Sequence, residues 1–291
     1  MNFLFARKLL RYSCIAATAL FGLASLSRAQ SSPIGGGAGS SVPNQSQVGQ
    51  SGGTMNDQLQ YGTMGHEVER EQNSAFQAFS KERDPGKKIQ KGREFLLKYP
   101  KSPFVEQVDA GLMDTYRTQA DWKNEYAYAD RALVLNPRDV DVLTTVGWTI
   151  PHVYNPSDSD ADQELRKAET YAKQAIEILA TMPKPPDLKE AEFAAAKARR
   201  TFQAHSALGL VYFRRQDYDN SAKELDLATK DNPTPDQTDL FVLGADLQNL
   251  NRSGEAADAF GRCGQIAGAL QDRCKQSAAA AKAQADQSKP K

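Results

Sequence analysis

The sequence predicts an all-α protein made of stacked helical hairpins, and three observations lead to this fold class. From about Val68 onward, apolar residues recur with the period of an α-helix almost without interruption. Small and bulky residues also return at fixed places within successive stretches of about 34 residues. Residues 188–215 contain no Pro and no Gly except Gly209, which favours one long helix. A stack of this kind is sized by its number of repeats, so the length of 291 residues does not set a number of domains.

Residues 202–233 carry the repeated pattern most clearly, with Phe202 counted as the first place. A glycine at the eighth place lets a second helix cross close by, because it has no side chain. Bulky residues at the eleventh and twenty-fourth places fill the seam between the two helices, and a proline ends the second helix. The residues at places 7, 8, 11, 24, 27 and 32 are Leu208, Gly209, Tyr212, Leu225, Ala228 and Pro233.

Three other stretches repeat this pattern, and a degenerate hairpin that begins near Val68 precedes them. They begin near Glu106, Val140 and Gln237. The residues at matching places are Leu112, Tyr116, Ala132 and Pro137 in the second hairpin, Gly147 in the third, and Gly244, Ala256 and Phe260 in the fifth.

The third hairpin has a long connection over residues 151–164, and Pro151 is expected to end its first helix. The long helix over residues 188–215 extends the fourth hairpin backwards, where we expect it to cover that connection. After Gly268, a polar and alanine-rich helix is expected to cap the last apolar face.

This pattern resembles the tetratricopeptide repeat, a helix-turn-helix unit. It departs from the family at His205, where an aromatic residue is usual at the fourth place, and at Ser221, where alanine is usual at the twentieth. The resemblance implies a right-handed α-solenoid of about five hairpins plus a C-terminal capping helix over residues 66–285. It also implies a concave side, lined by the first helix of each hairpin, that binds a protein or peptide.

By the geometry of the family, one set of residues would line this concave side: Asp114, Arg117, Trp148, Leu210, Phe213, Arg214, Phe241, Ala245 and Gln248. Aromatic and apolar anchors flanked by charges suit an extended peptide or a partner helix. For Trp148 and Phe213 the alternative of packing beneath the long connection or between repeats stays open.

Residues 1–29 have the organisation of a cleavable export signal. Positive charge at Arg7, Lys8 and Arg11 precedes an apolar run over residues 12–26. A retained membrane anchor is the alternative, although this run falls short of the ~20 residues that a membrane-spanning helix needs. We therefore expect an exported protein, periplasmic or secreted, with no stable membrane span after signal cleavage.

Two further segments are expected to lack a packed structure. Residues 30–65 are rich in Gly, Ser and Gln and contain few large apolar side chains, which is typical of a disordered linker. Residues 286–291 are expected to be a disordered tail.

Composition and motifs exclude several classes of function. The chain has 36 basic and 36 acidic residues, and loss of the four basic residues of the signal leaves 32 against 36, a net charge of about −4. A mildly acidic body without a basic block argues against nucleic-acid binding. Because no Gly-rich phosphate loop, nucleophile elbow or zinc-type helix motif is present, we expect no enzyme activity, no cofactor and no small-molecule substrate.

The histidines predict no metal site. His66, His152 and His205 are far apart, and none has a cysteine or carboxylate at a metal-binding spacing. His205 is expected to pack at a helix seam.

An acidic stretch offers an alternative. Its carboxylates have several of the spacings of a calcium-binding helix-loop-helix, but the glycine required at the sixth place is replaced by Gln163. The favoured interpretation is a solvated linker in which Asp162 caps the next helix. The acidic residues are Asp158, Asp160, Asp162, Glu164 and Glu169.

Cys263 and Cys274 are the cysteines that remain once the signal, which holds Cys14, is removed. An even number in an exported protein favours a disulfide that pins the last helix. Their spacing leaves open the alternative of two buried free thiols.

Residues 95–108, FLLKYPKSPFVEQV, look like the repeats of bacterial envelope proteins. Together with the export signal and the repeat pattern, this resemblance implies a non-enzymatic scaffold or adaptor of the bacterial cell envelope that holds a partner polypeptide. The alternative is a structural component of envelope assembly that oligomerises, or supports a larger complex, through its outer surface.

Overall fold

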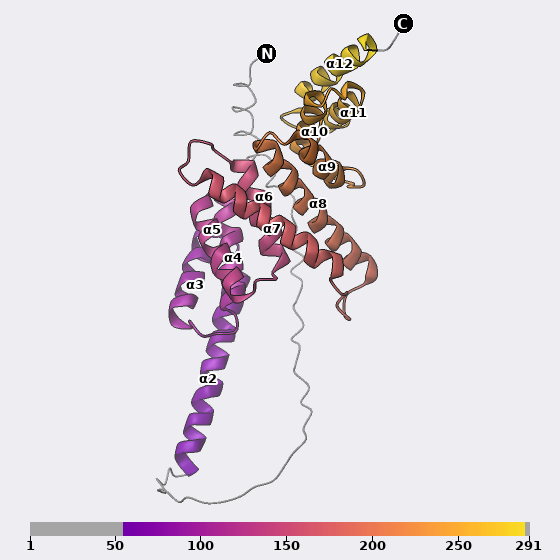
Figure 1. Cartoon of the computed structure of the whole chain (residues 1–291). Coiled ribbons are helices and arrows are strands. Elements are labelled where there is room, and N and C mark those ends of the chain that lie inside the picture. The colour runs from indigo at the N-terminus through magenta and orange to yellow at the C-terminus, as the bar shows by residue number, and fades with distance from the viewer. Residues whose placement is uncertain (1–54, 289–291) are drawn as a thin grey trace, which may run out of the picture.

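In the computed structural model of the chain, the structure describes residues 55–288, with side chains from Glu67 onward. Every regular element in this range is a helix, so the predicted all-α class is confirmed (Figure 1). The eleven helices of this range are α2 (Met55–Ser80), α3 (Pro85–Lys98), α4 (Val105–Thr118), α5 (Trp122–Leu135), α6 (Val140–Val153), α7 (Ala161–Thr181), α8 (Glu190–Arg214), α9 (Tyr218–Thr229), α10 (Gln237–Asn249), α11 (Ser253–Gln265) and α12 (Gln271–Gln287).

The ends of this range differ from the segment limits expected from sequence. Residues 55–65, which the sequence predicts to be part of the linker, belong to α2, and the first two residues of the expected tail belong to α12. The predicted signal, residues 1–29, lies outside the described residues.

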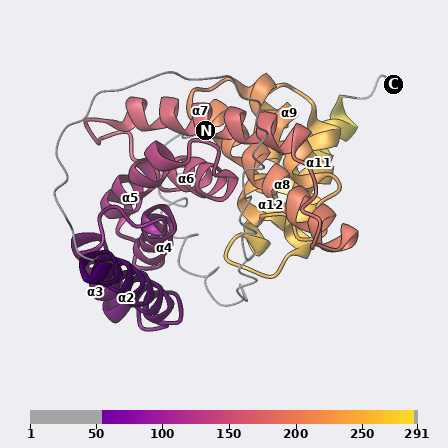
Figure 2. The same cartoon turned by 90° about the horizontal axis from the view of Figure 1, so that it is seen from below.

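Each helix packs against the next one in the chain, so α2 to α11 form five consecutive pairs and α12 packs on α11. Viewed from below, the pairs follow an arc (Figure 2). In this view α4 and α6 lie on the inner side of the arc, while α5 and α7 lie on its outer side.

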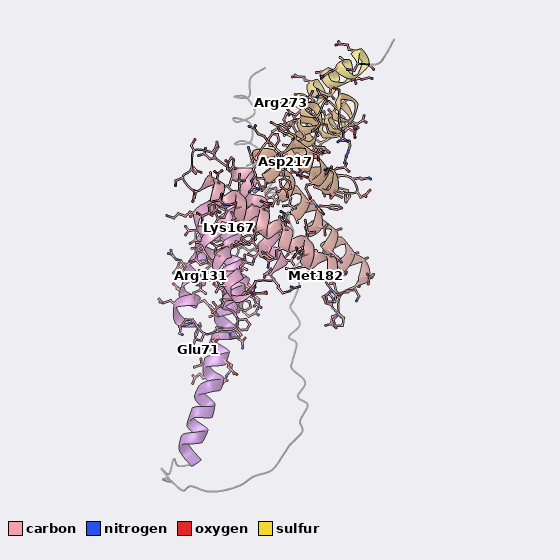
Figure 3. All side chains as sticks on the ribbon, viewed as in Figure 1. Glu71, Arg131, Lys167, Met182, Asp217 and Arg273 are labelled. Atoms are coloured by element: carbon pink, nitrogen blue, oxygen red, sulfur yellow. A yellow bond between two sulfur atoms is a disulfide. The ribbon has the colours of Figure 1, made fainter. Side chains whose placement is uncertain are left out.

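The turns of three hairpins share one backbone geometry. Ala120, Gln216 and Asn251 each have a positive φ, between 55° and 64°. In each hairpin the next residue donates its N–H to a carbonyl five positions back, as Asp217 does to Tyr212 at 3.0 Å. Asp217, labelled in Figure 3, then caps α9 by accepting from the backbone N–H of Asn220. These turns reverse the chain within a few residues.

Glycines allow the close crossings inside two of these pairs. A Cβ at Gly209 would lie 2.5 Å from Cγ of Leu225, and one at Gly244 would lie 2.6 Å from the Phe260 ring. In both cases the partner follows sixteen residues later, so the two crossings have the same register. At Gly147 the nearest atom, the carbonyl oxygen of Ala168, would lie 3.5 Å away, which is an ordinary contact.

The third hairpin differs from the expectation in three ways. The helix α6 does not end at Pro151 but continues to Val153, which is possible because a proline in the last turn disrupts few helical hydrogen bonds. The helix α7 begins at Ala161, so Asp162 lies within its first turn and does not cap it.

The third difference concerns the long helix α8. Its first half does not cover the long connection, because Arg200 pairs with Asp141 at the opposite end of α6. It is the last turn of α8 that reaches the connection, where Arg214 lies 5.4 Å from the Tyr154 ring.

Candidate functional site

The residues expected to line the concave side belong to α4, α6, α8 and α10, the first helices of four consecutive pairs. One of them was wrongly assigned. Leu210 is 0% exposed and belongs to the core between α8, α9 and α10, since its position on α8 faces the next pair. The other members of the set keep part of their surface exposed.

Trp148 contributes to packing as well as to the surface. It lies against the buried cluster of Ala172, Ala207 and Leu208, and its ring centroid lies 3.7 Å from that of His152. The packing role that the sequence left open therefore holds for Trp148, which joins α6 to α7 and α8.

Arg214 is held in place by the end of α6. Its Nε and Nη2 donate to the carbonyl oxygen of Pro151 at 3.2 and 2.9 Å. Burial lowers the pKa of this guanidinium to about 10, so it remains charged at neutral pH. It supplies a fixed positive charge next to the last turn of α6.

The half-exposed face of α10 carries Phe241, Ala245 and Gln248, which are spaced by four and three residues and so lie on one side of the helix. Phe241 is partly enclosed, with the Phe260 ring 5.5 Å away and the guanidinium of Arg273 over its ring at 5.1 Å. Gln248, near the C-terminal end of α10, is the polar member of this set and is partly exposed.

Two carboxyl groups are buried at seams between pairs. Glu125 of α5 lies close to Thr149 of α6, and Asp246 of α10 lies close to Ser221 of α9. Both are 0% exposed, and burial raises the pKa of each to about 8. At neutral pH these groups are therefore predominantly protonated.

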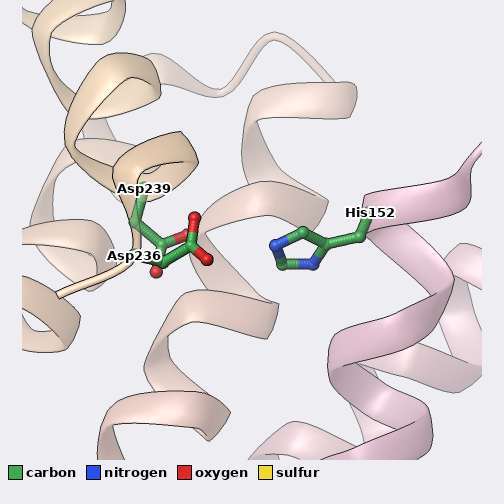
Figure 4. A group of neighbouring side chains, drawn as sticks. All are labelled: His152, Asp236 and Asp239. Atoms are coloured by element: carbon green, nitrogen blue, oxygen red, sulfur yellow. The ribbon is translucent and has the colours of Figure 1, made fainter. Parts of the chain in front are cut away.

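A third polar cluster joins residues that are distant in sequence. His152 of α6 faces Asp236 and Asp239, which lie at the start of α10, and one ligand atom from each lies within 4.8 Å of the other two. Figure 4 shows the imidazole pointing from one side and the two carboxylates from the other. Burial lowers the pKa of His152 to about 4 and raises that of Asp239 well above its ordinary value.

Spacing rules could not find this cluster, because 84 residues separate His152 from Asp236. Within residues 67–288 it is the one group of three such side chains with atoms close enough for a shared ion. The acidic stretch considered for calcium does not converge: Asp158 accepts from the Asn155 side chain at 2.7 Å, and Glu169 pairs with Lys173 and Arg215.

The structure also places His205 and the two cysteines of the last hairpin. His205 lies at the seam between α8 and α9, with Nδ1 2.7 Å from Oε2 of Glu224, as expected for a packed histidine. Cys263 and Cys274 form a disulfide with their Cα atoms 5.6 Å apart. This bond fastens α12 to α11, so the two free thiols considered as an alternative are not present.

No protein-family model matches the chain, and a comparison with curated proteins finds no match. Among the helices of residues 55–288, none combines the length and the apolar character needed to cross a bilayer.

Proposed function

We propose that the protein is an exported scaffold whose tetratricopeptide-like hairpins form a right-handed α-solenoid and hold a partner polypeptide on the inner side of the arc. One observation carries this proposal. The first helices of four consecutive pairs, α4, α6, α8 and α10, each keep aromatic, amide or charged side chains partly exposed. Such side chains provide both anchors and hydrogen-bonding groups for a peptide or a helix.

The repeat geometry supports the same proposal. The positive-φ turn residue falls at the fifteenth place of the second, fourth and fifth hairpins, and the glycine and its bulky partner fall at places 8 and 24 of the last two. Because the turn and the crossing are repeated, each helix pair is rotated by nearly the same angle relative to the pair before it. Such a constant rotation generates a curved stack.

Location outside the cytosol is supported by two features. The first is the signal-like composition of residues 1–29. The second is the disulfide between Cys263 and Cys274, because such bonds persist in oxidising compartments.

A second candidate function is assembly through the outer surface, and exposed apolar side chains favour it. Leu97 of α3 is 85% exposed and Val134 of α5 is 80% exposed. Each lies three residues before the proline that ends its hairpin, Pro100 or Pro137, so the two occupy the same place in consecutive repeats. The return of a large, highly exposed apolar side chain at one place of consecutive repeats is the observation that favours a contact surface there.

Charge substitutions on the two sides distinguish these candidates. The inner variant carries Asp114→Arg and Gln248→Arg, and the outer variant carries Leu97→Lys and Val134→Lys. Both sets change exposed or half-exposed side chains, so the far-ultraviolet dichroism and the unfolding midpoint should stay close to those of the parent.

The readout is quantitative affinity capture from the envelope of the native host. The scaffold proposal predicts that partners captured by the parent are lost with the inner variant and retained with the outer variant. Loss with the outer variant alone would instead identify the outer surface as the functional one.

A further inference from the structure

The cluster of His152, Asp236 and Asp239 lies in the interior of the fold and is not needed for the proposed binding of a polypeptide. His152 is 5% exposed and Asp239 is 3% exposed, while Asp236 is half-buried. Burying two carboxyl groups next to each other is unfavourable unless a proton or a cation compensates for their charge.

The orientation of the His152 ring is defined by its own helix. Nδ1 lies 2.7 Å from the carbonyl oxygen of Trp148, and because a carbonyl only accepts hydrogen bonds, Nδ1 must carry the proton. In the neutral ring the lone pair is then on Nε2, which faces the two carboxyl groups (Figure 4). This Nε2 is buried and has no hydrogen-bond partner among the described side chains and backbone groups.

The carboxyl groups are held in the same way, each through one oxygen. Asp239 accepts from the Ser206 hydroxyl at 2.8 Å, and Asp236 accepts from the backbone N–H of Thr238 at 2.6 Å as the cap of α10. A hydrogen bond from the protein to a ligand residue on the side remote from the ion is the usual way in which metal ligands are oriented.

We propose that His152, Asp236 and Asp239 together bind one divalent transition-metal ion, with Zn²⁺ the best match. One imidazole nitrogen and two carboxylate oxygens are three of the four ligands of a tetrahedral zinc site, and a water molecule or a partner's side chain would complete it. The imidazole ligand argues against Ca²⁺ and Mg²⁺, which prefer oxygen.

The geometry requires only a small adjustment. Ligand atoms around tetrahedral zinc lie roughly 3.3 Å apart, as follows from bonds of about 2.0 to 2.1 Å. Since the three atoms already lie within 4.8 Å of one another, side-chain rotations that close the longest distance by about 1.5 Å complete the site. Two aspartates also balance the double charge of the ion, although Arg214 adds a repulsive charge nearby.

Binding of an ion here would connect the third hairpin to the fifth across α8. His152 lies at the end of α6 and Asp236 at the start of α10, so the ion would fix the distance between two helices that are not neighbours in the chain. The metal is therefore expected to set the curvature of this half of the molecule.

Zinc titration of the full chain tests this proposal, after metal is removed with a chelator and with the disulfide left intact. Isothermal calorimetry and metal analysis after dialysis give the affinity and the stoichiometry. We expect one Zn²⁺ per chain with a Kd in the micromolar range or below.

Three conservative variants test the assignment of ligands. Asp236→Asn still caps α10, because asparagine is an equally good cap, and Asp239→Asn still accepts from Ser206. Each should weaken zinc binding by about 100-fold or more, and His152→Gln should do the same. Ser206→Ala, which removes only the support of Asp239, should weaken it by about tenfold.

The matched control is His205→Gln, since His205 faces a single carboxylate, Glu224. This variant should bind zinc as the parent does. Absence of stoichiometric binding to the parent would overturn the proposal. Binding that Asp236→Asn weakens by less than tenfold would also overturn it, because the zinc would then lie elsewhere.

Discussion

Replacing glycine by alanine at the eighth place of two hairpins should lower stability at Gly209 and leave it unchanged or higher at Gly147. At Gly209 the new Cβ would lie 2.5 and 2.6 Å from two carbons of Leu225 and 3.2 Å from its backbone nitrogen. Overpacking of this kind costs about 1 to 3 kcal/mol, whereas alanine in a helix contributes about 1 kcal/mol relative to glycine. Because the backbone of α9 must move as well, we expect Gly209→Ala to lower the free energy of unfolding by about 1 to 2 kcal/mol.

At Gly147 the same change should be neutral or stabilising. The nearest atoms would lie 3.5 to 3.6 Å from the new Cβ, so the helix-propensity gain of up to about 1 kcal/mol is not opposed. Urea unfolding followed by circular dichroism measures both variants under the same conditions.

A double variant assigns the Gly209 effect to one contact. Leu225→Ala alone should cost about 2 to 5 kcal/mol, because Leu225 is fully buried. In that background Gly209→Ala should cost much less, since the two clashing side-chain carbons are gone and only the close backbone nitrogen of residue 225 remains. An equal loss with and without Leu225, or a larger loss at Gly147 than at Gly209, would refute the close-crossing argument.

Three further predictions concern the turns, the buried carboxyl groups and the disulfide. Gln216→Gly should raise the free energy of unfolding by about 1 kcal/mol, because glycine adopts a positive φ without strain. Asn251→Gly should raise it less, since asparagine tolerates that conformation. Equal effects of the two variants in urea unfolding would contradict this reasoning. The pKa of Asp246 is raised to about 8, so its stabilising contribution is complete below pH ~4 and is lost as the pH rises through 8. Between pH 5 and pH 9, the free energy of unfolding of Asp246→Asn should therefore fall by less than that of the parent, and the difference should be on the order of 3 kcal/mol. Parallel pH profiles for the two proteins would count against the burial of this carboxyl. Replacing Cys263 and Cys274 by alanine should cost about 2 to 3 kcal/mol, and addition of a reductant should then have no further effect on the variant's unfolding midpoint.

Much of the fold could be predicted from sequence, because helix boundaries and pair crossings depend on local signals. The uninterrupted run over residues 188–215 predicted α8, and the spacing of Gly209 and Leu225 predicted a close crossing of α8 and α9. The positive-φ turns were less evident, since Ala120 and Gln216 occupy positions where glycine would be the usual signal.

Residues that depend on the curvature of the stack were harder to predict. Leu210 and Phe213 lie on similar faces of α8, and whether such a side chain reaches solvent depends on how closely α10 approaches. The same curvature brings His152 to Asp239, and no local spacing contains this information. Side chains on helices two hairpins apart become neighbours only once the angle between successive pairs is known.

The most direct test of an inner binding surface is site-specific photo-crosslinking in living cells of the native host. A photoreactive residue replaces Gln248 on the half-exposed face of α10 or, as a matched control, Leu227 on α9, which is 51% exposed. If the partner binds the inner side, Gln248 should form a discrete crosslinked product with another polypeptide and Leu227 should not. Products from Leu227 with none from Gln248 would contradict binding on the inner side.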